Sequence, residues 1–179
     1  MSDFNLFIVL DIEGIISKNE YSGTKKSPAM ISEDFIHILL IDQGKNELLD
    51  KKGITLMLDD VKRGDVINWS IINLPNYQDS YSALLYKYER EKKNPQVMSD
   101  PKLTVRTIKL PYILSDSNTD NIETKEIKEN FWSSRVMVLD KKVGEENYYG
   151  FFTIYDSKGE VIGYSKFNNH LILNPVDNK

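Results

Sequence analysis

The sequence has 179 residues, the size of one ordinary domain with a full hydrophobic core. Its 40% hydrophobic and 28% charged residues are typical of a globular domain, and its net charge of -4 excludes a dedicated nucleic-acid binder, which would carry a basic stripe. The absence of cysteine excludes disulfides, thiolate metal sites and cysteine nucleophiles. We expect a single domain over residues 1–175 and a disordered tail over residues 176–179.

The first fourteen residues, MSDFNLFIVLDIEG, contain the first apolar run of the chain. The run extends from Leu6 to Leu10, is interrupted at Asp11, and has no basic region before it. These features are typical of neither a signal peptide nor a membrane span. We therefore expect a cytoplasmic location without membrane insertion, and we leave release by a non-classical route open.

Short apolar runs separated by turn residues recur along the chain, and its ten Tyr, seven Phe and two Trp favour strands. They predict an all-β fold with at most one short helix: a single-domain antiparallel β-sandwich of about nine to ten strands, jelly-roll-like or Ig-like. Trp69 and Trp132 are expected to anchor its core. The predicted strands are 4–12, 34–41, 54–61, 65–72, 81–89, 103–110, 133–140, 148–156 and 161–167, with 170–174 completing the last.

Two turns have a sequence that explains them. Asp156-Ser157-Lys158-Gly159 predicts an antiparallel hairpin, because Asp opens a type I turn and Gly takes the left-handed position. Lys62-Arg63-Gly64-Asp65 contains the tripeptide Arg-Gly-Asp, known as a cell-adhesion signal. We interpret it as a structural corner in which Gly64 supplies a positive φ and its charged neighbours face water, because such tripeptides arise often by chance in turns.

The segment from Asn94 to Asn130 is the least regular part of the sequence. Three prolines place its strand, 103–110, at the edge of a sheet. Residues 115–121 are polar and predict a mobile loop. Residues 122–130, IETKEIKEN, are predicted to form the one helix, with Thr119 or Asp120 as its cap.

The histidines and paired acids of the chain do not form a recognisable catalytic motif. We expect His37 to be a satisfied strand residue and His170 to lie in a loop or at a strand edge. The acid pairs Asp59-Asp60 and Glu145-Glu146 are expected to be solvated. The sequence also lacks a nucleophile elbow, a phosphate-binding glycine-rich loop and a zinc helix. We therefore expect no enzyme and no cofactor.

The loop from Asn73 to Asp79 is the most interesting candidate site. It offers the aromatic ring of Tyr77 beside short amides and a carboxylate, which is the combination that sugar recognition requires. Calcium could assist through Asn76 and Asp79. The alternative interpretation is a turn with a packed tyrosine. The full candidate ligand set is Asn73, Asn76, Tyr77, Asp79 and, from a neighbouring loop, Asn168 and Asn169.

Four segments are similar in order and spacing to one known family: NLFIVLDIEGI, RGDVINW, SIINLPNYQDSYSALLY and FWSSRVMVLDKKVGEENYYGFFTIYDSKGEVIGY. They resemble the PixA/AidA family of bacterial inclusion-body proteins. The resemblance implies a β-sandwich linked to inclusions, quorum-regulated expression or virulence, without established catalysis. It favours a self-associating homo-oligomer that acts in host interaction. The alternative is a lectin-like module that binds a glycan at the loop end.

The sequence departs from the family in two respects. It has only five Met, which argues against a methionine-storage role. Many relatives carry Trp-Asp-Pro after a Gly-Tyr pair, whereas Gly163-Tyr164 is here followed by Ser-Lys and then Phe167-Asn168-Asn169. If the Trp-Asp-Pro serves binding in the relatives, this chain has lost or altered that function.

Overall fold

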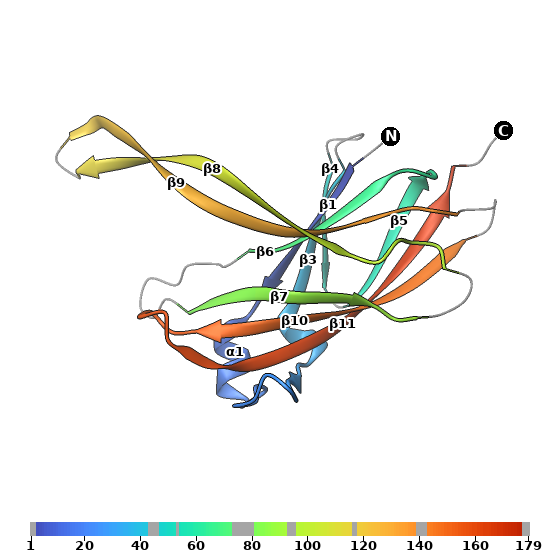
Figure 1. The fold of residues 1–179 in the computed structure, drawn as a ribbon, viewed down its shortest axis with the longest axis horizontal. Helices are drawn as coiled ribbons and strands as arrows, with labels where there is room; N and C mark the ends of the chain where they lie inside the picture. The colour runs from blue at the N-terminus through green and yellow to red at the C-terminus, as the bar shows by residue number, and fades with distance from the viewer. Residues whose placement is uncertain are drawn as a thin grey trace.

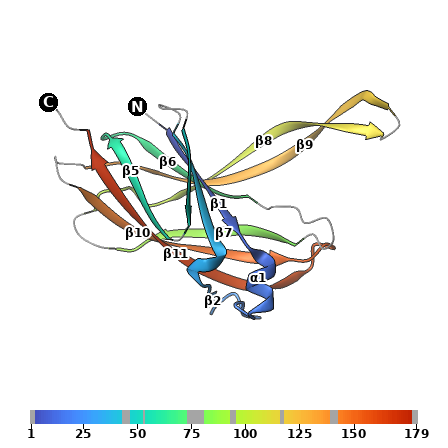
Figure 2. The ribbon, with the colours of Figure 1, turned by 180° about the vertical axis from the view of Figure 1, so that it is seen from behind.

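The computed structural model describes residues 3–42, 47–52, 54–72, 81–92, 96–115, 118–138 and 143–176. Within these ranges the fold is all-β, as predicted, with eleven strands in two sheets, one short α-helix and one 3-10 turn. Figure 1 and Figure 2 show the two sheets as layers, with one long hairpin leaving them at the side. Each sheet contains parallel as well as antiparallel pairs, so the two sheets are mixed, where the sequence predicted antiparallel pairing.

The first sheet has the order β4–β3–β1–β6–β9–β8. β1 pairs in antiparallel with β3 and in parallel with β6, and therefore lies inside the sheet. Its side chains alternate between the buried inner face and the outer face, because successive residues of a strand point to opposite sides. The strands are β1 (Asp3–Leu10), β3 (Ile36–Asp42), β4 (Glu47–Lys52), β6 (Val66–Ile72), β8 (Lys102–Ser115) and β9 (Asn118–Arg135).

The second sheet has the order β2–β11–β10–β7, and β5 also pairs with β11. Because β10 occupies one edge of β11, β2 and β5 share the other edge, at residues 165–166 and 170–175 of β11. The strands are β2 (Ala29–Met30), β5 (Thr55–Val61), β7 (Ser82–Arg90), β10 (Gly144–Tyr155) and β11 (Val161–Pro175).

A cluster of aromatic rings lies in the core between the sheets. The ring of Trp69 lies 5.0 Å from that of Tyr88 and 4.9 Å from that of Tyr148, and the two tyrosines stack on each other at 5.3 Å. Burial raises the pKa of both tyrosines above the ordinary value, so both rings stay neutral in the folded protein. The prediction that Trp69 anchors the core is confirmed. Trp132 is half-buried against the core, and its indole N–H donates to the Leu85 carbonyl at 3.2 Å.

The one α-helix lies elsewhere than predicted. Residues 122–130 belong to β9, where they pair in register with β8, so the prediction of a helix there is wrong. The helix α1 (Ile12–Ser17) instead follows β1 directly and lies at the lower end of that strand in Figure 2. Asp11 caps it by accepting the backbone N–H of Gly14 at 2.9 Å.

Other boundaries also differ from the prediction. β4 was not predicted, because its sequence ELLDKK has few strand-favouring residues. The 3-10 turn η1 (Glu33–Phe35) occupies the predicted start of β3. β9 ends at Arg135, and only a single bridge, between Met98 and Val136, continues the predicted strand 133–140 within its described part.

The hairpin between β10 and β11 is confirmed. The strands pair in antiparallel over nearly their whole length, and Gly159 has a φ of 80°. Asp156 organises the turn, because its Oδ1 accepts the backbone N–H groups of Lys158 at 2.9 Å and Glu160 at 2.8 Å.

The Arg-Gly-Asp segment forms a corner between sheets. It leads from β5 in the second sheet to β6 in the first, and these two strands do not pair, so the predicted corner connects the two sheets. Gly64 has the predicted positive φ, 96°. The side chain of Asp65 does not face water as expected: the residue is 1% exposed, and its carboxylate accepts the backbone N–H of Lys62 at 2.8 Å. An adhesion signal requires an accessible carboxylate, so this burial supports a structural role for the tripeptide.

Candidate functional site

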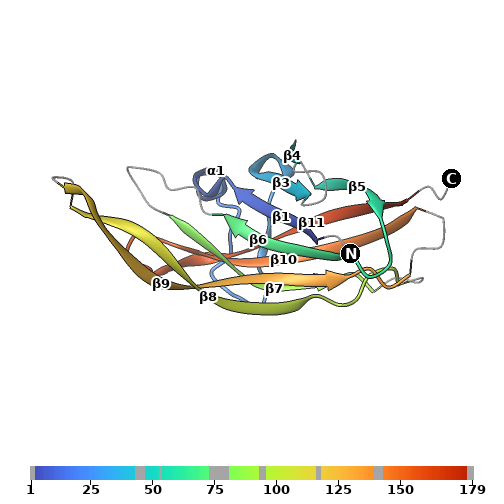
Figure 3. The ribbon, with the colours of Figure 1, turned by 90° about the horizontal axis from the view of Figure 1, so that it is seen from above.

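The most distinctive feature of the molecule is a long hairpin formed by the outer parts of β8 and β9. β9 pairs with β6 only from Trp132 to Arg135, whereas its pairing with β8 continues to Asn118. Residues 104–115 and 118–131, which we call the arm, therefore pair only with each other in the described part of the chain. Figure 1 and Figure 3 show the arm extending past the ends of the other strands.

The arm exposes an unusual amount of apolar surface. Ile113 and Ile122 lie opposite each other near its tip and are 54% and 61% exposed. Exposed ion pairs lie between the tip and the body, such as Arg106 with Glu129 at 2.8 Å, and contribute little to stability in water. The large exposed apolar side chains of the arm are Val105, Leu110, Tyr112, Ile113, Leu114 and Ile122, and Leu103 adjoins them.

A buried ion pair holds the segment that leads into the arm. The guanidinium of Arg90 on β7 lies 3.2 Å from the carboxylate of Glu146 on β10, and both side chains are at most 5% exposed. Glu146 Oε1 also accepts the backbone N–H groups of Val97 at 2.8 Å and Met98 at 3.0 Å. The expectation that Glu146 is solvated is therefore wrong. Glu145, its neighbour, has an exposed side chain, as expected.

The charge state of Arg90 follows from its partners. Burial by itself lowers the pKa of Arg90, but the charge and hydrogen bonds of Glu146 and Asp100 more than offset this effect, so the pKa is raised. Arg90 is thus a permanent cation, and Glu146 compensates its charge in the interior.

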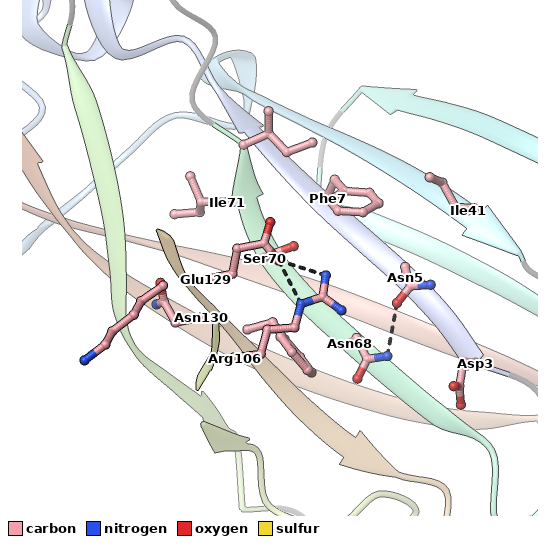
Figure 4. Close-up of a pocket in the computed structure, with 13 residues that line it drawn as sticks. Asp3, Asn5, Phe7, Ile41, Asn68, Ser70, Ile71, Arg106, Glu129 and Asn130 are labelled. Carbon is pink, nitrogen blue, oxygen red and sulfur yellow. Dashed lines mark hydrogen bonds and ion pairs between the residues drawn. The ribbon is translucent and has the colours of Figure 1, made fainter. Parts of the chain in front are cut away.

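A hollow of about 730 Å³ lies where the arm leaves the body, on the outer face of the first sheet. It arises because β9 pairs with β6 only as far as Trp132, while β6 continues beside β1 to Ile72. Figure 4 shows side chains of β1, β6 and the arm around this space. The lining consists of Asp3, Asn5, Phe7, Ile41, Asn68, Ser70, Ile71, Ile72, Arg106, Lys128, Glu129, Asn130 and Phe131.

The floor of the hollow contains hydrogen-bonded polar side chains. Asn5 and Asn68 line it from neighbouring strands, and Ser133, outside the lining, lies beside Asn68 on the next strand. The Ser133 hydroxyl donates to Asn68 Oδ1 at 2.7 Å, and Asn68 Nδ2 donates to Asn5 Oδ1 at 3.0 Å. In the next register position, Phe7 stands opposite Ser70. The floor thus combines fixed amides with an aromatic ring.

The arm forms the wall of the hollow. Both Nε and Nη2 of Arg106 lie 2.8 Å from Glu129 Oε2, and the guanidinium lies 5.6 Å from the centre of the Phe131 ring. These contacts hold a planar cation and a carboxylate at the edge of the hollow. Asp3 and Lys128 are the other charged residues of the lining, so two positive and two negative side chains line the hollow.

The structure tests only part of the predicted ligand set. Asn73, Asn76, Tyr77 and Asp79, including the expected calcium position, lie outside the described residues. Asn168 and Asn169 are described, and the expectation that they lie in a loop is wrong, because both belong to β11. Asn169 is buried and accepts the Tyr88 hydroxyl at 2.6 Å, which makes it a core residue.

The residues of the hollow were missed by sequence reasoning. A weak signal was present, because polar residues occupy alternate positions of two otherwise apolar strands, at Asp3 and Asn5 in β1 and at Asn68 and Ser70 in β6. In an antiparallel or parallel pair such positions share one face. The sequence does not reveal that the two strands are neighbours.

Histidines and acids do not converge on a metal-type site within the described ranges, where no group of three or more such side chains is close enough to hold an ion. His37 lies half-buried in β3, as expected for a strand residue. His170 belongs to β11, with its Nε2 3.5 Å from a Glu145 carboxylate oxygen. Among the described residues, no helix is long and apolar enough to cross a membrane.

The fold and its surface features define a class: an all-β protein of two packed sheets with a projecting hairpin arm. The family model described as "PixA: Inclusion body protein" matches residues 2–172. The chain therefore belongs to the PixA family of inclusion body proteins, and the predicted resemblance is confirmed.

A solved structure supports the same fold. The crystal structure of an inclusion body protein of the PixA family from Burkholderia cenocepacia J2315 matches with a TM-score of 0.66 and 16% sequence identity. The match covers 96% of this chain and 95% of that one. Because the identity is low, the likeness extends to the fold alone. A comparison with curated proteins gives no match.

Proposed function

We propose that the protein is a non-catalytic, self-associating member of the inclusion body family, which accumulates in bacterial inclusions and acts in the interaction with a host. The arm is the observation that carries this proposal. Ile113, Ile122 and their apolar neighbours on the arm are exposed on a ribbon that the other described parts of the chain do not cover. Apolar surface of this kind is stabilised when a partner removes it from water. The partner that we propose is a second copy of the chain.

The size of the arm favours a reciprocal exchange between two copies. The arm contains residues 104–115 of β8, so the two-stranded ribbon is about 40 Å long and about 10 Å wide. One face then covers about 400 Å², roughly half of the ~800 Å² that each partner contributes to a standard interface. If each copy lays its arm on the other, each buries both an arm face and the surface that receives the partner's arm. Such an exchange has C2 symmetry and reaches the standard size.

Contact through the face of the arm is favoured over extension of its sheet. β8 lies at the end of the first sheet and has a free edge in the described part of the chain. Pro111 in β8 has no N–H group and therefore removes one donor from that strand. Edge strands that carry proline are poor templates for a further strand. We therefore assign the contact to the exposed side chains.

The test is sedimentation velocity with light scattering at tens of micromolar protein. We expect the wild type to be a dimer or a larger closed assembly, and the double variant Ile113→Glu/Ile122→Glu to be monomeric. The matched control is Met57→Glu, which places the same charge at a 50% exposed apolar position of β5. A monomeric wild type, or a double variant that assembles as the wild type does, would contradict the proposal.

Carbohydrate binding is the second candidate function. The predicted loop from Asn73 to Asp79 lies outside the described residues, so the support for this candidate now comes from the hollow beside the arm. The hollow combines an aromatic ring with hydrogen-bonded amides and a charged pair.

A further inference from the structure

The amides on the floor of the hollow are oriented before any ligand arrives. The chain of hydrogen bonds runs from the Ser133 hydroxyl through Asn68 to Asn5 Oδ1. Each amide is therefore held by its neighbour, and the Nδ2 donors of Asn5 have no partner among the described residues. A ligand that accepts these donors does not have to order a free side chain, which removes part of the entropic cost of binding.

The wall of the hollow supplies acceptors as well as donors. Among the described residues, Glu129 binds Arg106 through Oε2, and its Oε1 can accept a hydrogen bond from a ligand. Arg106 Nη1 can donate a hydrogen bond to the same ligand. Figure 4 shows this pair and the amides of Asn5 and Asn68 lining the same space, with Phe7 at its side. A ligand with groups that both donate and accept can therefore contact the floor and the wall together.

The charges of the lining decide between ligand classes. Arg106 and Lys128 are balanced by Asp3 and Glu129, so the hollow has no excess of either sign. A phosphate or a polyanion would be repelled by the two acids, and a polyamine would be repelled by the two cations. A neutral ligand is repelled by neither pair.

We propose that the hollow binds a neutral saccharide, with the apolar face of one sugar ring on Phe7 and its hydroxyls on Asn5 and Glu129. A hydroxyl both donates and accepts, as the amide and the carboxylate require. The C–H face of a sugar ring suits an aromatic side chain. The volume of about 730 Å³ lies within the usual range for small-ligand sites, and the open side leaves room for a longer glycan to continue.

The test is NMR titration of the full chain, labelled with ¹⁵N, against methyl glycosides of galactose, mannose, fucose and N-acetylglucosamine. Sialic acid and a sulfated disaccharide serve as acidic probes. We expect at least one neutral glycoside to shift the signals of the Asn5 and Asn68 side-chain amides with an affinity in the millimolar range. Asn5→Ala and Glu129→Ala should each weaken binding by about tenfold, because each removes one directed contact.

The matched control is Asn174→Ala, which removes an amide from β11 that donates to Asp59 at 2.7 Å, and neither residue belongs to the lining of the hollow. It should bind as the wild type does. All variants are first checked for unchanged thermal unfolding. If none of the neutral probes shifts the floor amides, or if both site variants bind undiminished, the proposal is wrong. Tighter binding of the acidic probes would also overturn it and assign the hollow to anions. None of these variants alters the tip of the arm, so failure here leaves self-association standing.

Discussion

Replacing Glu146 by glutamine should destabilise the protein by several kcal/mol. The substitution keeps the size and shape of the side chain but removes its charge. Among the described residues, Arg90 would then keep only Asp100, whose side chain is 72% exposed, as an ionised partner in the interior. Because Arg90 keeps its proton, its charge cannot be relieved by titration.

The magnitude follows from burial. Removing one partner of a buried ion pair costs about 3–5 kcal/mol, because the other charge is left uncompensated. The glutamine oxygen can still accept the backbone N–H groups of Val97 and Met98, so the loss should lie at the lower end, about 3 kcal/mol. An exposed ion pair contributes only about 0–1 kcal/mol, so the measured loss distinguishes a buried pair from an exposed one.

The assay is urea unfolding followed by the fluorescence of the two tryptophans, with the free energy of unfolding extrapolated to water. The control is Glu89→Gln on the same strand as Arg90, because the pair of Glu89 with Lys87 is about half exposed on both sides. A cycle with Arg90→Met measures the coupling directly. A loss below about 1 kcal/mol for Glu146→Gln, equal to that of the control, would refute the reasoning.

Three further predictions use the same urea assay. Gly150→Ala should lower stability by about 1–3 kcal/mol, because a Cβ would overlap the ring of Phe167, whereas Gly23→Ala, which meets no atom within 4 Å, should change it little. Gly64→Ala should cost about 1 kcal/mol or more, because φ is 96°. Burial raises the pKa of Tyr148, so the unfolded chain loses a proton that the folded one keeps, and stability should fall as pH rises above the ordinary value of 10.0. The Tyr148 hydroxyl has only the Ser134 hydroxyl nearby and no well-formed hydrogen bond among the described residues, so Tyr148→Phe should be nearly neutral at pH 7 and should lessen the alkaline loss.

Local patterns predicted most strands and one hairpin well, because the conformation of these elements is decided by residues that are close in sequence. The apolar runs of β1, β6 and β7 match their observed strands to within one or two residues at most ends. The turn at Gly159 was predicted from its own chemistry, and the structure confirms it. In these cases the neighbours that decide the conformation are also neighbours in sequence.

The strand conformation of the arm was mispredicted because it depends on pairing with residues that are distant in sequence. Residues 122–130 carry Glu and Lys at spacings that suit a helix, and intrinsic preference alone favours it. Pairing with β8 overrides that preference over the whole length of β9, from Ile122 opposite Ile113 to Ser133 opposite Lys102. The register is visible only when both strands are considered together.

Burial of acids was equally hidden from the sequence. Asp65 and Glu146 stand in runs of charged or turn residues, where acids are usually solvated. Asp65 is buried because the chain turns from one sheet to the other at that point, and Glu146 is buried because the segment at Val97 crosses it. The hollow likewise depends on the parallel pairing of β1 with β6, two strands that are far apart in sequence.

The two proposals together predict a difference between binding in solution and binding at a surface. A single shallow site with a millimolar affinity contributes only about 4 kcal/mol, so one copy would leave a glycan surface quickly. Two sites held in one assembly act at an effective concentration that can raise the avidity by about 10²–10⁴. The double variant Ile113→Glu/Ile122→Glu should therefore bind a free methyl glycoside as the wild type does, because the hollow is intact, yet leave a dense immobilised glycan much faster. Surface plasmon resonance at high and low glycan density tests this. Equal dissociation of wild type and double variant at high density would show that association through the arm does not link the sites.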